Sequence, residues 1–195
     1  MPLPPDLHIV DDPAVPVAEL LAEQARRGGS IVLTGGSSPA PAYARAAALE
    51  PDWSKVTLWW GDDRCVPPEH EWSNYRLAKE TLLDHLEEQP REVHRIRGEL
   101  SPAEAADELD DEVHRATSGP PGLEPWVERV TMTMPEIRTA KRIVFIVDGP
   151  SKAEAVARAF GGNISPAAPA SLVLLAPISV EVFLDESAAA KLRGG

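Results

Sequence analysis

"IVLTGGSSPAPAYARAA", residues 31–47, predicts a strand that turns directly into a helix. The apolar run from Ile31 to Leu33 is typical of a buried strand, and two glycines and two serines interrupt it shortly afterwards. We expect Ser38 to be the N-cap of the helix, with Pro39 at its first position. A strand, a short loop and a helix in this order indicate an α/β protein.

The four residues between strand and helix, Gly35, Gly36, Ser37 and Ser38, have the composition of an anion-binding loop. Glycines let backbone amides turn toward one point, serine hydroxyls add donors, and the helix contributes the positive end of its dipole. The pattern favours a phosphate. It is not a nucleotide-binding P-loop, because no Gly-Lys-Ser/Thr follows, and the full dinucleotide glycine pattern is lacking. A tight turn that binds nothing is the alternative.

The rest of the chain extends the α/β pattern. Short apolar runs alternate with segments of helical spacing, as in a largely parallel sheet covered on both faces, and we expect one domain over residues 1–195. Capping boxes predict two helix starts, Ser101 with Glu104 and Ser151 with Glu154. The expected strands lie at 7–10, 30–36, 55–64, 93–99, 127–135 and 142–149, and the expected helices at 12–29, 38–50, 73–88, 101–117 and 151–162.

The composition limits the classes of partner. The chain has 195 residues, with 19 basic and 31 acidic side chains and a net charge of −12. A field of this sign repels nucleic acid and anionic lipid, so we expect neither as a partner, and an anion site needs a local cluster of donors. The single Cys65 excludes an internal disulfide. Without a signal-like segment or a membrane-length apolar run, the sequence predicts a cytoplasmic protein.

A second polar cluster stands at the end of an apolar strand, where ligands of open α/β sheets collect. Asp62, Asp63 and Arg64 follow directly on the apolar residues 56–60. Arginine can hold a phosphate or carboxylate through two hydrogen bonds, and a neighbouring aspartate can orient it or accept a proton. A surface ion pair is the alternative.

Two further side chains are candidates for the same site. Lys152 is expected at the first position of a helix, where the dipole disfavours a cation, so its place there indicates an anion nearby. A solvated lysine at a helix end is the alternative. His70 is the histidine nearest in sequence to Asp62 and Arg64. No metal-ligand spacing appears, so the sequence predicts no metal and no cofactor.

The chain contains, in this order, the segments LTGGSSPAPAY, LWWGDDRCVPPEHEWSNYRLAKETLL, VHRIRGE, RVTMTMPEIRTAKRIVFIVDGPSKAEAV and the closing ASLVLL and VEVFLDESAA. These segments resemble those of 6-phosphogluconolactonases, in the same order along nearly the whole chain. The resemblance implies a Rossmann-like three-layer α/β/α sandwich with a mostly parallel sheet. It also implies hydrolysis of 6-phosphogluconolactone, a sugar phosphate, to 6-phosphogluconate in the oxidative pentose phosphate pathway. Glucosamine-6-phosphate deaminases and isomerases share the superfamily, but the GDDRCVPP segment argues against their activity.

The resemblance also assigns roles to residues. Asp62 resembles the active-site carboxylate. The residues that resemble the phosphate loop and the cationic substrate clamp are Gly35, Gly36, Ser37, Ser38, Arg64 and Lys152.

The chain departs from the family near residues 117–127. Members carry there a buried apolar strand and a loop of the type Gly-Met-Gly-x-Asp-Gly-His, whose histidine is taken as the general base. Only SGPPGLEP stands in their place, so we expect a few dozen residues and one interior strand to be missing. A deletion in the gene or an altered chain would explain this equally. Hydrolysis is then expected to be impaired, with His70 or Asp62 as partial substitutes for the base. A non-catalytic sugar-phosphate-binding relative is the alternative.

Overall fold

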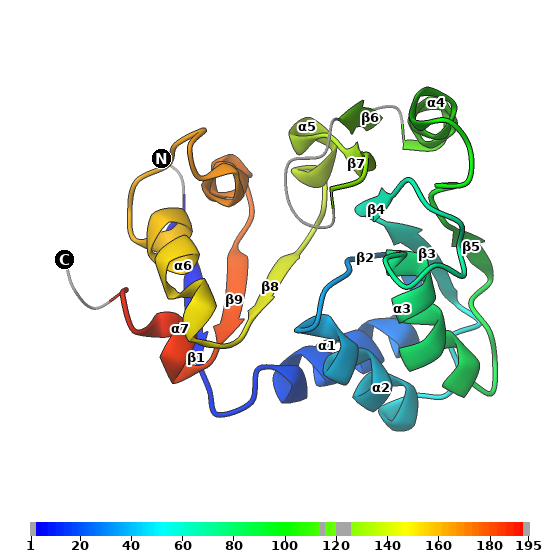
Figure 1. Ribbon diagram of the computed structural model, residues 1–195. Helices are drawn as coiled ribbons and strands as arrows, with labels where there is room; N and C mark the ends of the chain where they lie inside the picture. The colour runs from blue at the N-terminus through cyan, green and yellow to red at the C-terminus, as the bar shows by residue number, and fades with distance from the viewer. Residues whose placement is uncertain (1–2, 114–115, 120–125, 193–195) are drawn as a thin grey trace. The chain divides into compact units, whose positions relative to one another are not determined.

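The computed structural model describes residues 3–113, 116–119 and 126–192 (Figure 1). The chain forms two compact units. The first unit consists of Met1–Val17 and Ile137–Gly195, and the second unit of Ala18–Glu136. Helix α1 (Ala14–Arg27) crosses from the first unit into the second.

A parallel sheet of three strands organises the second unit. Its strands are β2 (Gly29–Leu33), β3 (Val56–Trp60) and β5 (Glu92–His94), in the order β2-β3-β5. Helices α2 (Pro39–Leu49) and α3 (Asn74–Thr81) contact each other, and a 3-10 turn, η1 (Leu83–His85), follows α3. Alternate strand residues point into the core of this unit. The largest of them, Leu33, Leu58 and Trp60, are at most 2% exposed.

A second, antiparallel sheet of the same unit carries the polar cluster. It consists of β4 (Asp62–Arg64), β7 (Arg129–Met132) and β6 (Ala116–Gly119), in the order β4-β7-β6. Helix α4 (Pro102–Val113) contacts β6 and β7. Gly61 joins this sheet to the parallel one, because its N–H donates to the Leu33 carbonyl (2.9 Å) and its carbonyl accepts from the Met132 N–H (2.8 Å).

The first unit has its own parallel sheet. Strands β1 (Asp6–Ile9), β9 (Val180–Leu184) and β8 (Ile143–Val147) lie in the order β1-β9-β8. Helix α6 (Ala153–Phe160) contacts the short helix α7 (Glu186–Ala189). The remaining elements are α5 (Met134–Ile137), at the boundary of the units, and the 3-10 turns η2 (Pro150–Lys152) and η3 (Pro169–Leu175).

The predicted helix starts are confirmed in part. Ser101 and Glu104 form their capping box, with the Glu104 carboxylate accepting from the Ser101 N–H (3.1 Å). Helix α2 begins at Pro39 as expected, but Ser38 has helical backbone angles and its side chain makes no cap hydrogen bond. The second capping box is wrong, because η2 precedes α6 and moves the N-cap to Lys152. The Glu154 carboxylate pairs instead with Lys191 (2.6 Å).

The sheets also differ from the single sheet expected from the sequence. The described strands form three sheets, with β2 at an edge of one and β8 at an edge of another. Residues 116–119, part of the irregular join, form β6, because pairing with β7 satisfies their backbone in a way that no local pattern reveals. Of the junction at 117–127, residues 120–125 lie outside the described residues.

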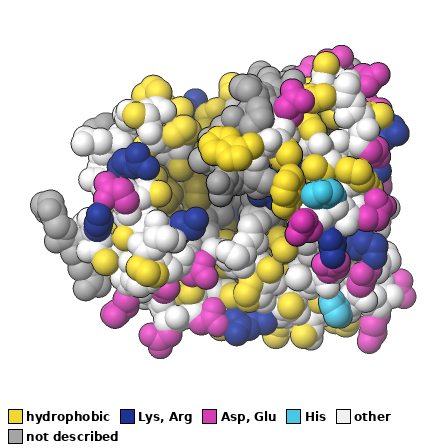
Figure 2. Space-filling model, in the orientation of Figure 1, with side chains coloured by type: hydrophobic (Ala, Val, Ile, Leu, Met, Phe, Trp, Pro, Cys, Tyr) yellow, Lys and Arg dark blue, Asp and Glu magenta, His cyan; other side chains and the backbone are white. Residues whose placement is uncertain are grey.

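Charged side chains of both signs are scattered over the drawn face of the molecule, among hydrophobic and uncharged ones (Figure 2). Acidic groups are spread over this face rather than gathered in one patch. No helix in the described ranges combines the length and apolar character needed to cross a bilayer.

Candidate functional site

The loop after β2 is held at its base by Tyr43 of α2. The Thr34 N–H donates to the Tyr43 hydroxyl (3.0 Å), which in turn donates to the Thr34 carbonyl (2.8 Å). Burial raises the pKa of the Tyr43 phenol far above its usual value, so the hydroxyl remains protonated. One side chain therefore fixes the peptide from which the loop departs.

Beyond Thr34 the loop presents its backbone to solvent. Gly36 has φ +106°, which a residue with a side chain rarely adopts, and Gly36 and Ser37 are exposed. Within the described part of the chain, the N–H groups of Gly35, Gly36 and Ser37 donate no hydrogen bond. These donors precede the N-terminus of α2, an arrangement suited to an anion.

Replacing Tyr43 by phenylalanine should remove both hydrogen bonds of the hydroxyl and leave the Thr34 peptide unsatisfied. We expect the free energy of unfolding to fall by about 1–2 kcal/mol, measured by urea denaturation. Tyr75→Phe is the matched control, because the contacts of Tyr75 with Trp60 and Arg95 involve its ring, which phenylalanine keeps. Equal losses in the two variants would contradict the role assigned to Tyr43.

Strands β4 and β7 place four polar side chains on one face. Asp62 lies opposite Thr131, and Arg64 lies opposite Arg129. Because side chains alternate between faces, these four share a face, while Asp63 turns to the buried side. Two arginines directly opposite each other repel, so a carboxylate or another anion between them is stabilising.

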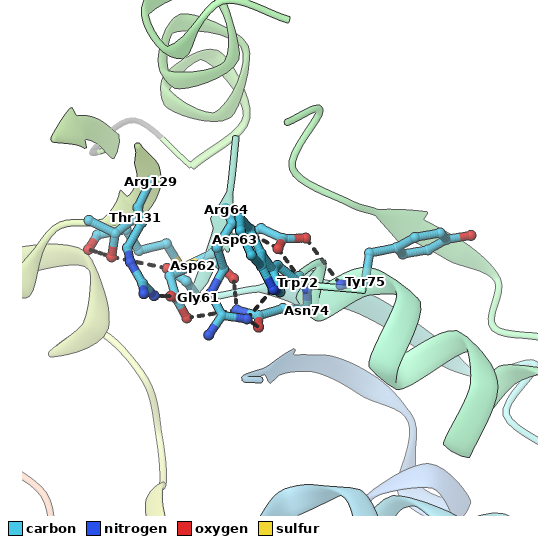
Figure 3. A network of polar contacts seen from close by, with 10 residues as sticks. Gly61, Asp62, Asp63, Arg64, Trp72, Asn74, Tyr75, Arg129 and Thr131 are labelled. Atoms are coloured by element: carbon cyan, nitrogen blue, oxygen red, sulfur yellow. Dashed lines mark hydrogen bonds and ion pairs between the residues drawn. The ribbon is translucent and has the colours of Figure 1, made fainter. Parts of the chain in front are cut away.

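Asp63 connects β4 to the start of α3 (Figure 3). Its carboxylate accepts from the N–H groups of Asn74 (2.7 Å) and Tyr75 (3.1 Å), from the N–H of Arg64 (2.8 Å) and from the Ser73 hydroxyl (3.2 Å). Burial raises its pKa, and these hydrogen bonds oppose the shift. Asp63 is 2% exposed, so its role is to hold α3 against the site rather than to meet a ligand.

Asp62 is the carboxylate that faces the two arginines. Its Oδ2 lies 3.7 Å from Nη1 of Arg129, and its Oδ1 accepts from Nδ2 of Asn74 (3.3 Å). Burial raises its pKa, while Arg64, Arg129 and the Asn74 amide act in the opposite direction. A carboxylate with a raised pKa is a stronger base than an ordinary aspartate.

Arg64 is fixed at one end of its guanidinium. Nη1 donates to the Trp72 carbonyl (2.8 Å) and to Oδ1 of Asn74 (Figure 3). Its Nε is buried and, among the described residues, has no hydrogen-bond partner. A buried donor left unpaired is costly, and an anionic ligand would satisfy it.

His70 lies in the loop that holds Arg64. Its Nδ1 accepts from the Trp72 N–H (3.2 Å), and its ring meets the Trp72 ring edge-on, with 4.9 Å between centroids. The Trp72 carbonyl is the acceptor for Arg64, so His70 is one residue removed from the guanidinium. With Nδ1 engaged as an acceptor, Nε2 carries the proton of the neutral ring.

The structure brings together the predicted loop, Asp62 and Arg64 in the second unit. Lys152 lies in the first unit, so its convergence with the loop stays a prediction. Sequence reasoning missed Asn74 and Arg129 as members of the site. Both residues stood within segments of the resemblance, Asn74 in SNY and Arg129 in RVTMTMP, but strand pairing is what places Arg129 opposite Arg64.

Comparison with known proteins shows the family of this chain. A family model described as "Glucosamine-6-phosphate isomerases/6-phosphogluconolactonase" matches residues 10–125 and 116–183. The chain belongs to this family. A 6-phosphogluconolactonase from Mycobacterium leprae is 31% identical to this family member over 223 residues, covering 89% of each chain.

Solved structures show the fold of this family member. It is similar to a 6-phosphogluconolactonase from Thermotoga maritima, with a TM-score of 0.82, 19% identity, and coverage of 92% of this chain and 99% of the other. A monomeric glucosamine-6-phosphate deaminase has a TM-score of 0.83 at 18% identity, covering 95% of this chain and 99% of the other. The predicted Rossmann-like α/β class with mainly parallel sheets is therefore confirmed. Because both activities occur on this fold, the fold does not distinguish between them.

The alignments also bear on the predicted gap. The Mycobacterium leprae alignment extends over 223 positions but takes in 89% of a 195-residue chain, so about 50 positions have no counterpart here. The two segments matched by the family model overlap at residues 116–125, within the irregular join. Sequence and alignment thus point to the same part of the chain.

Proposed function

We propose that this chain binds 6-phosphogluconolactone and hydrolyses it, at a reduced rate, to 6-phosphogluconate. The observation that carries the proposal is the arrangement in the second unit. Loop 35–38, in which Gly36 and Ser37 are exposed, is joined through Asn74 to the guanidinium of Arg64 and the carboxylate of Asp62. The relatives named 6-phosphogluconolactonases support this substrate over the aminosugar phosphate of a deaminase.

The proposed binding mode places the phosphate on the loop and the sugar acid toward Arg64. The loop offers backbone N–H groups and the dipole of α2, which suit a phosphate. Arg64 offers a cation with an unpaired donor, and Arg129 adds a second cation on the same face of the β4–β7 ribbon. Lys152 is proposed as a further contact to the anion. In a chain of net charge −12, local cations are needed to attract such a ligand.

In the proposed reaction, a water oxygen forms a bond to the lactone carbonyl carbon and the ring carbon–oxygen bond breaks. A base removes a proton from the water, and the ring oxygen takes up a proton as it becomes a hydroxyl group. The arginines would stabilise the negative charge that develops on the carbonyl oxygen. Asp62 is proposed as the residual base, since burial raises its pKa toward the working range.

The proposed reduction in rate follows from the missing segment. The resemblance places the usual histidine base in a Gly-rich loop, and no Gly-Met-Gly-x-Asp-Gly-His sequence is present in this chain. A positioned base contributes about 10²–10⁴-fold to such reactions. His70 is the second candidate. Because Nε2 carries the proton of its neutral ring, Nδ1 would have to exchange the Trp72 N–H for the proton of the water. A protein that binds the ligand without catalysis is the alternative proposal.

A pair of measurements tests the proposal. We expect 6-phosphogluconate to raise the melting temperature and the protein to accelerate lactone opening above the spontaneous rate. Asp62→Asn should abolish the acceleration while leaving the thermal shift, because it removes the base but not the donors. Asp62 acts as a base only when ionised, so its contribution should rise with pH through its raised pKa and then level off.

Asp84→Asn serves as the matched control for charge, because Asp84 is exposed and its ion pair among the described residues is with Lys79, at the far end of α3. Its activity should equal that of the original chain. Absence of any thermal shift would refute binding. Binding without acceleration would establish the non-catalytic alternative, and full activity in Asp62→Asn would exclude Asp62 as the base.

A further inference from the structure

Asn74 is a buried polar side chain at the centre of the site network. It is the first residue of α3 and is 2% exposed. Its backbone N–H donates to Oδ1 of Asp63 (2.7 Å), which fixes the start of the helix relative to β4. The side chain thus leaves the backbone from a defined point.

Both polar atoms of the Asn74 side chain are bound. Oδ1 accepts from Nη1 of Arg64, and Nδ2 donates to the carbonyl of Asp62 (2.9 Å) and to its Oδ1 (3.3 Å). A guanidinium can only donate and a carbonyl can only accept, so the amide has one possible orientation. Asn74 therefore holds Arg64 and Asp62 on opposite sides of one rigid group.

The third neighbour of this amide is the loop. A Cβ atom placed on Gly35 would lie 1.7 Å from Oδ1 of Asn74 and 2.1 Å from its Cγ. The amide therefore lies directly against the Gly35 backbone, closer than any side chain on that residue would permit. Gly35 is needed here for close approach, and not for a positive φ, which belongs to Gly36.

The hydrogen bonds of the Asn74 side chain do not serve to cap α3. The N-cap is Ser73, whose hydroxyl accepts from the Arg76 N–H (3.2 Å), and the next N–H groups are bound by Asp63. The amide makes its hydrogen bonds to Arg64 and Asp62 and its close contact with Gly35. All three are site residues.

We propose that Asn74 is a positioning residue that sets the spacing between the anion-binding loop and the Arg64 guanidinium. The inference rests on the proposed function, in which the loop holds the phosphate and Arg64 the acid end of the ligand. A ligand that spans both groups depends on this spacing, whereas a free phosphate ion on the loop does not. The amide acts through Arg64 and the loop, without itself contacting the ligand.

Titration calorimetry with two probes tests the spacing. In Asn74→Ala, 6-phosphogluconate should bind about 10-fold more weakly, while the affinity for inorganic phosphate changes by less than about 2-fold. Ser73→Ala is the matched control, since it removes a buried cap on the neighbouring residue and should lower the melting temperature without changing the ratio of the two affinities. If Asn74→Ala does not fold, Asn74→Ser replaces it.

A reciprocal substitution tests the contact itself. Gly35→Ala should destabilise the fold because its Cβ meets the Asn74 amide, and the double variant with Asn74→Ala should recover most of the melting temperature. If Asn74→Ala leaves the ratio of the two affinities unchanged, for example by weakening the binding of both probes equally, the positioning role is overturned. Failure of the original chain to bind either probe would instead refute the proposed function, and the positioning role with it.

Discussion

Replacing Asp63 by alanine should lower the free energy of unfolding by about 3–4 kcal/mol, measured by urea denaturation. The carboxylate accepts from three backbone N–H groups and one hydroxyl, and the substitution leaves these donors without an acceptor in a region closed to solvent. Each unsatisfied buried donor costs about 1–3 kcal/mol, less where water enters the space. Since α3 is tied to β4 through this residue, the loss should also reduce ligand binding.

Asparagine at position 63 separates the hydrogen bonds from the charge. Its amide oxygen can still accept from the Arg64 and Asn74 N–H groups, but its NH₂ would face the Tyr75 N–H. We therefore expect the free energy of unfolding of Asp63→Asn to lie between that of the original chain and that of Asp63→Ala. Asp52→Ala is the control, because Asp52 accepts two hydrogen bonds from Ser54 in an exposed turn. A loss as large for Asp52 as for Asp63 would contradict the importance of burial.

Much of the fold could be predicted from the sequence because the decisive signals are local. The strand–loop–helix unit at 31–47, with Pro39 starting the helix, depends on neighbouring residues only. Ser101 and Glu104 specify a helix start in the same way. Ser151 and Glu154 have the same spacing, yet they fail, because a 3-10 turn before the helix displaces its start. Local patterns predict well only where no adjoining turn competes.

Strand partners could not be predicted in the same way. Residues 116–119 lack an apolar pattern and become a strand through pairing with β7. Pairing of β7 with β4 sets Arg129 opposite Arg64, although 65 positions separate them along the chain. Propensity carries no information about such contacts, because a strand's partner is set by the whole sheet.

The residues of the candidate site also fall into those that local sequence reveals and those that only the folded structure reveals. The loop, Asp62 and Arg64 were found because each follows an apolar strand, and strand ends are where ligands collect. Asp63 and Asp62 are adjacent and identical in type, but one faces the interior and the other faces the arginines. The alternation of β4 decides which is structural, and it becomes evident only once the strand is placed. Asn74 required the close approach to Gly35, which only coordinates reveal.

Replacing Arg64 by alanine should weaken binding of 6-phosphogluconate by about 10–100-fold, measured by titration calorimetry. Hydrogen bonds to a charged group contribute about 1.5–3 kcal/mol, and the ligand would lose both the cation and its unpaired donor. Arg64→Lys should restore part of the affinity. Lysine retains the charge but cannot hold the Trp72 carbonyl and the Asn74 amide with one planar group while presenting another N–H to the ligand.

Arg76→Ala is the control that separates contact from overall charge. Arg76 lies two residues from Asn74 on α3 and pairs with Glu80 (2.6 Å), so its removal changes the net charge by the same amount. If long-range attraction alone drew the anion to the protein, both variants would lose affinity equally, and raising the salt concentration would abolish the difference from the original chain. A direct contact predicts that only the Arg64 variants lose affinity, and that the loss persists at high salt because a partly buried pair is weakly screened.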